Sequence, residues 1–144
     1  KDLYGWTLHT AELLRNKKMN ELDFENIVEE IEALGRSEKH GLISSIRLIL
    51  SHLLKWQYQP DKRTPSWKAT IRTQRIQASF YLEDNPSLKS KNTMDEVLEK
   101  AYKRAVVEAA NDTSLDDKVF PEKCPYTFEQ IMDDQFYPES QKSD

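Results

Sequence analysis

The sequence has little of several features that would assign a protein to a class. Its single cysteine, Cys124, cannot form an intramolecular disulfide, and only 3 of its 144 residues are glycine. No run approaches the roughly 20 apolar residues of a membrane-spanning helix. Neither a glycine-rich phosphate loop nor a secretory signal is visible in the sequence as given. These absences predict a cytoplasmic protein that binds no membrane and carries no cofactor.

Charged residues make up 32% of the chain and apolar residues 38%. A helix in a small bundle buries one stripe and leaves its other faces in water, so this mixture is typical of helices. The net charge of −4 provides no overall attraction for nucleic acid. Binding of nucleic acid would therefore need a local basic patch.

Apolar residues recur at helical spacing along most of the chain, and no segment alternates as a strand does. We predict an all-α fold, a compact bundle of four main helices followed by short C-terminal helical turns. A single domain is expected over 1–138, with a frayed polar tail over 139–144.

Capping residues and prolines place the boundaries of most of these helices. The first helix is expected over 5–17. The later elements are expected from Thr64-Pro65 to 85, at 86–89, from a capping box of Thr93 and Glu96 to about 111, and from a capping box of Thr127 and Gln130 to about 133.

The longest predicted helix runs from Asp23 to about Tyr58. Asp23 suits its N-cap because a carboxylate there can accept from free backbone N–H groups. One stripe continues in phase along it, and we expect that stripe to face the core. Its positions are Val28, Ile31, Gly35, Glu38, Leu42, Ser45, Ile49, His52 and Trp56. Gly35 leaves open a kink, or two shorter helices, but the unbroken phase favours one helix.

Tryptophans and basic residues gather in the segment 55–75. Basic side chains interleaved with aromatic rings can hold phosphates and stack bases. The candidate binding residues are Lys55, Trp56, Lys62, Arg63, Trp67, Lys68, Arg72 and Arg75. Trp56 and Trp67 also lie on apolar stripes, and the arginines could pair with carboxylates. Structural pairing is therefore the favoured interpretation, and a binding surface is the alternative.

A row of carboxylates that includes Glu25, Glu29 and Glu32 shares one face of the long helix. Such a row can bind a divalent metal, so a metal-dependent hydrolase or nuclease using Glu29, Glu32 and His52 is one possible function. A solvated face is the more common use of such a row. No two histidines have the spacing of a helical metal motif, and we expect no metal.

Short motifs spread along the chain are similar to those of one known family. They are Glu29-Glu30-Ile31-Glu32, Leu34-Gly35-Arg36-Ser37-Glu38, His52-Leu53-Leu54-Lys55-Trp56, Gln59-Pro60, Ser66-Trp67, Thr70-Ile71, Gln74-Arg75, Pro86-Ser87-Leu88, Phe120-Pro121 and Cys124-Pro125-Tyr126-Thr127. Together they resemble a bacterial family of unknown function, domain-of-unknown-function family 29. The resemblance implies a compact helical domain without an assigned activity. It directs attention to Lys55-Trp56, Trp67 and Arg75, and to the polar-core candidates Glu29, Glu30, Arg36 and His52.

The sequence therefore predicts a non-enzymatic helical interaction module that binds a protein or a nucleic acid through the segment 55–75. The metal-dependent enzyme is the alternative, and the oligomeric state is left open.

Overall fold

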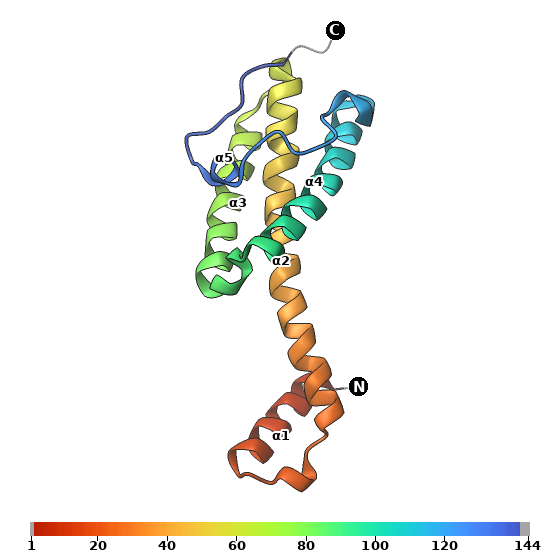
Figure 1. Ribbon diagram of the computed structural model, residues 1–144, viewed down its shortest axis with the longest axis vertical. Helices are drawn as coiled ribbons and strands as arrows, with labels where there is room; N and C mark the ends of the chain where they lie inside the picture. The colour runs from red at the N-terminus through yellow and green to blue at the C-terminus, as the bar shows by residue number, and fades with distance from the viewer. Residues whose placement is uncertain (1, 142–144) are drawn as a thin grey trace. The chain divides into compact units, whose positions relative to one another are not determined.

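The computed structural model describes residues 2–141 (Figure 1). Within this range the chain is helical and contains no strand. The α-helices are α1 (Leu3–Arg15), α2 (Phe24–Tyr58), α3 (Pro65–Asp84), α4 (Lys91–Thr113) and α5 (Phe128–Met132). The 3-10 turns are η1 (Met19–Glu21), η2 (Pro60–Lys62), η3 (Pro86–Lys89) and η4 (Asp117–Val119). The predicted all-α fold with four main helices is confirmed.

The chain divides into two compact units, an N-terminal unit that ends at Arg36 and a C-terminal unit that begins at Ser37. The single domain expected over 1–138 stays a prediction. Of the expected frayed tail, residues 142–144 lie outside the described residues. Ser140 and Gln141 are hydrogen-bonded, to Arg63 and to the carbonyl of Gln57. Over residues 2–141, no helix has the length and apolar character needed to cross a lipid bilayer.

The first helix begins and ends two residues earlier than predicted. It begins at Leu3 because the Asp2 carboxylate accepts from the backbone N–H of Gly5 at 2.9 Å, which makes Asp2 the N-cap. It ends at Arg15, and Lys17 then takes a left-handed conformation with φ of 57°. A left-handed residue cannot continue a right-handed helix.

The long helix α2 is unbroken through Gly35, so the alternative of two shorter helices is wrong. Its start is confirmed, because the Asp23 carboxylate accepts from the backbone N–H of Asn26 at 3.2 Å. It ends at Tyr58, two residues before Pro60, which cannot supply a helical hydrogen-bond donor.

The predicted inward stripe of α2 is correct only in its second half. Leu42 and Ile49 are fully buried, whereas Val28 is 51% and Ile31 65% exposed. The difference arises because α3 and α4 flank the C-terminal half of α2 (Figure 1). A face of a helix is buried only where another element covers it.

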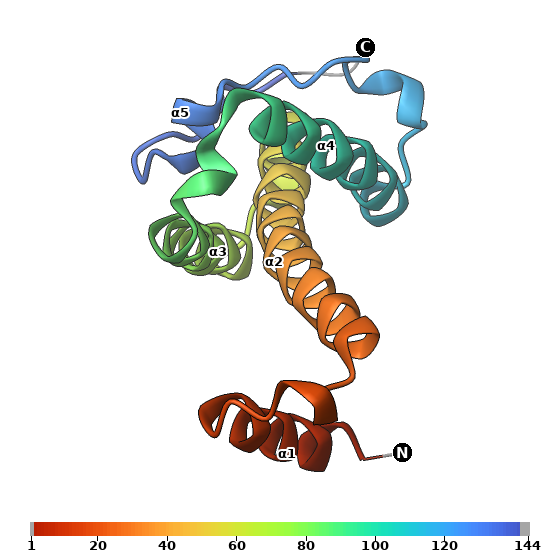
Figure 2. The same ribbon diagram turned by 60° about the horizontal axis from the view of Figure 1, so that its bottom comes forward.

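The core of the C-terminal unit surrounds the second half of α2. Figure 2 shows the segment after α4 crossing α2 and placing α5 beside α3. Adjacent residues such as Ile49 and Leu50, or Leu53 and Leu54, are therefore all fully buried. A helix covered on one side only would bury one member of each pair.

The two predicted capping boxes have different outcomes. The box of Thr127 and Gln130 at the start of α5 is confirmed, with its two hydrogen bonds at 3.1 and 2.9 Å. The box at Thr93 is wrong, because α4 already begins at Lys91 after the N-cap Ser90. Glu96 instead forms a salt bridge with Lys39 of α2.

Gly35 and Gly41 both lie within α2, yet alanine should act on them in opposite directions. A Cβ at Gly35 meets no atom within 4 Å, so Gly35→Ala should raise the free energy of unfolding by about 1 kcal/mol. A Cβ at Gly41 overlaps the Tyr81 ring, so Gly41→Ala should lower the free energy of unfolding. Urea titration measures both values. In a Tyr81→Ala background, Gly41→Ala should no longer lower the free energy of unfolding. If alanine raised the free energy of unfolding equally at Gly35 and Gly41 in the native background, this packing would be contradicted.

Candidate functional site

Arg75 lies in the interior of the C-terminal unit, with only 2% of its surface exposed. From α3 it reaches the C-terminal segment, where its Nε donates to the Ile131 carbonyl at 2.7 Å. Its Nη2 donates to the carbonyls of Phe136 at 2.9 Å and Gln130 at 3.4 Å. Free carbonyls at the end of a helix need such donors, so Arg75 caps α5 and holds the chain beyond it.

Groups around Arg75 offset the effect of burial on its charged form. Loss of solvent lowers the pKa of Arg75, and the nearby Tyr137, Asp134 and Asp133 act in the opposite direction. A guanidinium remains charged in proteins nevertheless. Its carbon lies 5.4 Å from the centre of the Tyr137 ring, which supplies a further cation–π contact.

Trp56 and Arg63 hold the chain after α5 from the other side. The Trp56 ring packs on the Tyr137 ring at a centroid distance of 5.0 Å. Arg63 lies over the Trp56 ring at 4.6 Å and donates from Nε to the Trp56 carbonyl at 3.0 Å. Its Nη2 donates to the Ser140 hydroxyl at 3.1 Å. The partly buried Trp56 ring thus contacts Tyr137 and Arg63 of its own chain, in place of a stacked base.

Two lysines of this segment, Lys55 and Lys68, also make contacts within the unit. Lys55 is buried, forms a salt bridge with Asp112 of α4 at 3.0 Å, and has its ammonium 5.2 Å from the Trp67 ring centre. Lys68 lies 5.2 Å from the Tyr137 ring centre. These contacts join α2, α3, α4 and the C-terminal segment.

The structure thus brings six of the eight candidate binding residues to internal contacts. Lys62 and Arg72 are exposed, and neither has a carboxylate within 4.0 Å among the described residues. Tyr137, on which Trp56, Lys68 and Arg75 converge, was not among the predicted residues. The aromatic pair Phe136-Tyr137, in an otherwise polar terminal segment, is the signal that could have identified it.

The predicted polar core does not form as a group. Glu29, Glu30 and Arg36 are all exposed on the part of α2 that belongs to the N-terminal unit. His52 alone is partly buried, and its Nδ1 lies 2.8 Å from the Leu48 carbonyl.

The residues of the alternative metal enzyme are not assembled either. Within the part of the chain that the structure describes, no three His, Cys, Asp or Glu side chains group as metal ligands would. Glu29 and Glu32 are exposed on α2, and His52 is hydrogen-bonded to its own helix. The metal-dependent function therefore receives no support from the geometry.

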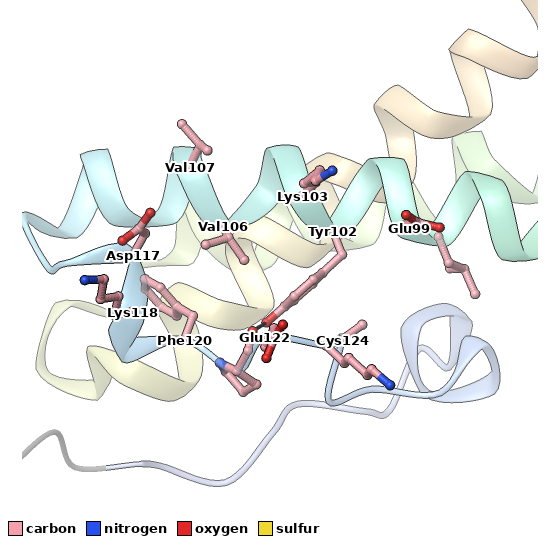
Figure 3. Close-up of a pocket in the computed structure, with 13 residues that line it drawn as sticks. Glu99, Tyr102, Lys103, Val106, Val107, Asp117, Lys118, Phe120, Glu122 and Cys124 are labelled. Carbon is pink, nitrogen blue, oxygen red and sulfur yellow. Dashed lines mark hydrogen bonds between the residues drawn. The ribbon is translucent and has the colours of Figure 1, made fainter.

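A hollow of the C-terminal unit lies between α4 and the segment 117–124 (Figure 3). Its volume is about 1050 Å³, and Tyr102 reaches across it from α4 toward Phe120 and Cys124. The Tyr102 hydroxyl donates to the Pro121 carbonyl at 2.5 Å. Burial raises the pKa of Cys124, so its thiol stays protonated and is a poor nucleophile.

Exposed apolar side chains are concentrated in the N-terminal unit. Among residues 2–141, nine of the twelve large apolar residues that are exposed lie there: Leu3, Tyr4, Leu8, Leu14, Met19, Phe24, Val28, Ile31 and Leu34. Within the described part of the unit, the large apolar side chains that are buried are Leu13 and Leu22. We call the surface formed by Phe24, Val28, Ile31 and Leu34 the N-terminal apolar face. A unit this short cannot enclose a core of its own, and contiguous exposed apolar surface marks interaction sites.

The fold and these contacts define an all-α protein with a buried arginine clamp and an uncovered apolar face. Residues 1–137 match the domain of unknown function DUF29, and the chain belongs to this family. This confirms the resemblance that the sequence motifs indicated. No curated protein and no solved structure matches the chain.

Replacement of Arg75 should destabilise the C-terminal unit strongly. Arg75→Ala leaves the buried carbonyls of Ile131 and Phe136 without donors, so the free energy of unfolding should fall by about 3 kcal/mol. Arg75→Lys should recover only part, since an ammonium lacks the planar fork. The exposed Arg72→Ala, one turn earlier on α3, is the control and should change stability by less than about 0.5 kcal/mol. Urea unfolding followed by tryptophan fluorescence checks this, and equal effects at Arg72 and Arg75 would contradict the clamp.

His52 should make stability fall as the solution becomes acidic. Burial lowers the pKa of His52 from its ordinary value of 6.5, against the smaller opposite effect of the Leu48 hydrogen bond. The contribution of neutral His52 to the free energy of unfolding is therefore complete above the pKa of the unfolded state. It is lost as pH falls through 6.5 toward the lower pKa of the folded state. Between about pH 7.5 and pH 5.5, the slope from one group is at most about 1.4 kcal/mol per pH unit.

Urea unfolding at a series of pH values measures this slope. His52→Asn should reduce it, because asparagine can keep a hydrogen bond to the Leu48 carbonyl but does not titrate. The exposed His40→Asn is the control. A slope that is unchanged in His52→Asn would show that the proton uptake occurs elsewhere.

Proposed function

We propose that the chain is a non-enzymatic interaction module that binds a helical protein partner through the N-terminal apolar face. The observation that carries the proposal is the exposure of this face, on which Ile31 is 65% and Leu34 69% exposed. Burying one such side chain in an interface contributes about 1.5–3 kcal/mol, so a few of them can support specific binding.

The charges around the face indicate the chemistry of the partner. Successive helical residues are about 100° apart, so Glu30 and Glu32 lie on the two edges of the stripe centred on Ile31. About two helical turns earlier, Asp23 and Glu25 repeat this arrangement, each seven residues before Glu30 or Glu32. All four carboxylates are exposed. The face therefore suits a helix with an apolar stripe and basic edges.

The geometry favours binding of a protein over binding of a nucleic acid. The aromatic residues of the segment 55–75 pack against Arg63, Lys55 and Tyr137, so they are not free to stack bases. This segment instead supports the C-terminal chain, and the exposed surface of the N-terminal unit is acidic.

A labelled basic amphipathic helical peptide is the probe for this proposal. It should bind the native chain saturably in a fluorescence anisotropy titration, and an acidic peptide with the same apolar stripe should not. Ile31→Asp should weaken binding by about tenfold to a hundredfold, as expected for losing one buried isoleucine.

Ile76→Asp is the matched control, because Ile76 is a helical isoleucine of similar exposure in the C-terminal unit. Both variants should unfold within about 0.5 kcal/mol of the native chain, since both positions are exposed. Absence of saturable binding, or equal weakening by the two variants, would overturn the proposal.

A further inference from the structure

A groove between α2 and α4 in the C-terminal unit has an apolar floor and basic rims. Its volume is about 730 Å³. It is lined by His40, Ile43, Ser44 and Arg47 from α2, and by Lys100, Lys103, Arg104, Val107 and Glu108 from α4. Val107 is 55% exposed, one of three large apolar residues so exposed in the described part of the C-terminal unit. Cations thus stand on both sides of an accessible apolar surface.

Two of the four lysine and arginine side chains in this groove are paired with carboxylates, and two are not. Glu108 is engaged by Arg47, and Lys100 has a distant contact with Glu96 at 3.8 Å. Lys103 and Arg104 are exposed and have no carboxylate within 4.0 Å among the described residues. On α4, Lys100, Lys103, Arg104 and Val107 share one face by their three- and four-residue spacing.

The N-terminal apolar face has the complementary pattern. Between Glu21 and Glu32 the chain carries six carboxylates and no basic residue, and all six are exposed. An apolar stripe with acidic edges therefore occurs on the same chain as an apolar floor with basic rims. Complementary charge arranged around apolar surface is the pattern of specific interfaces.

We infer that the partner of the N-terminal apolar face is a second copy of this chain, which binds it in the groove between α2 and α4. This inference rests on the proposed function and names its partner. Each copy supplies one acidic face and one basic groove, and in the proposed dimer the two copies make this contact twice. In each contact Ile31 and its neighbours lie on the exposed Val107, and Glu30 and Glu32 face the lysines and arginines of the rims.

Two charge-reversal variants test the contact. One carries Glu30→Lys and Glu32→Lys, which places basic edges against basic rims, and the other carries Lys103→Glu and Arg104→Glu, which opposes acid with acid. All four side chains are exposed, so the variants should fold, as circular dichroism will verify. Each variant alone should dimerise about tenfold or more weakly than the native chain in sedimentation equilibrium.

An equimolar mixture of the two variants should dimerise again. In the mixed pair, the basic face of the first variant meets the acidic groove of the second, and the native acidic face of the second meets the native basic groove of the first. Both contacts are then attractive. If the face instead bound the groove of its own chain, mixing would restore nothing, and that result would overturn the inference.

Lys62→Glu with Arg72→Glu is the matched control, because it reverses two exposed cations outside the groove. It should leave dimerisation unchanged, and an equal loss would show that only net charge matters. A native chain that is monomeric at every concentration, yet binds the basic peptide at Ile31, would overturn the dimer and leave the proposed function standing. A monomer that also fails to bind the peptide would overturn both.

Discussion

The C-terminal unit depends on a buried guanidinium that serves as a helix cap. The helix α5 has only five residues, too few to be stable in water without tertiary contacts. The donors of Arg75 satisfy the carbonyls of Ile131 and Phe136, at the end of α5 and just beyond it. Tyr137 is thereby held where Trp56, Lys68 and Arg75 all reach its ring. Isolated burial of a charge would be costly, and the carbonyl acceptors offset that cost.

The same chemistry explains why the segment 55–75 has the composition of a binding surface. Arginine and tryptophan make the same contacts with carbonyls, aromatic rings and anions in a binding partner as they make within a fold. Here Trp56, Arg63 and Arg75 use those contacts to hold the chain's own C-terminal segment. A resident segment therefore occupies the aromatic faces that a ligand would need.

The two units bury different shares of their apolar side chains. The C-terminal unit encloses the second half of α2 between α3 and α4, and few of its large apolar side chains remain exposed. The N-terminal unit consists of α1, η1 and the first part of α2, and it leaves most of its apolar residues uncovered. Such a surface is stable in solution only with a high density of charge around it, which the acidic run from Glu21 to Glu32 supplies. This surface therefore combines an apolar centre with acidic edges, and it supports the proposal that it binds a partner.

The sequence alone determined the elements whose signals are local. The caps at Asp23, Thr64 and Thr127 and the prolines at 60, 65 and 86 located the helix boundaries, and the unbroken apolar phase predicted one helix through Gly35. Such signals act within one or two turns, so they can be recognised in the sequence. Only the tertiary structure decided which apolar stripe is buried and where Arg75 points. Val28 and Ile49 occupy the same stripe, and Arg72 and Arg75 lie within one turn, yet one of each pair is exposed and the other buried. Burial depends on which distant element covers a face, and the spacing of residues along one helix does not contain that information.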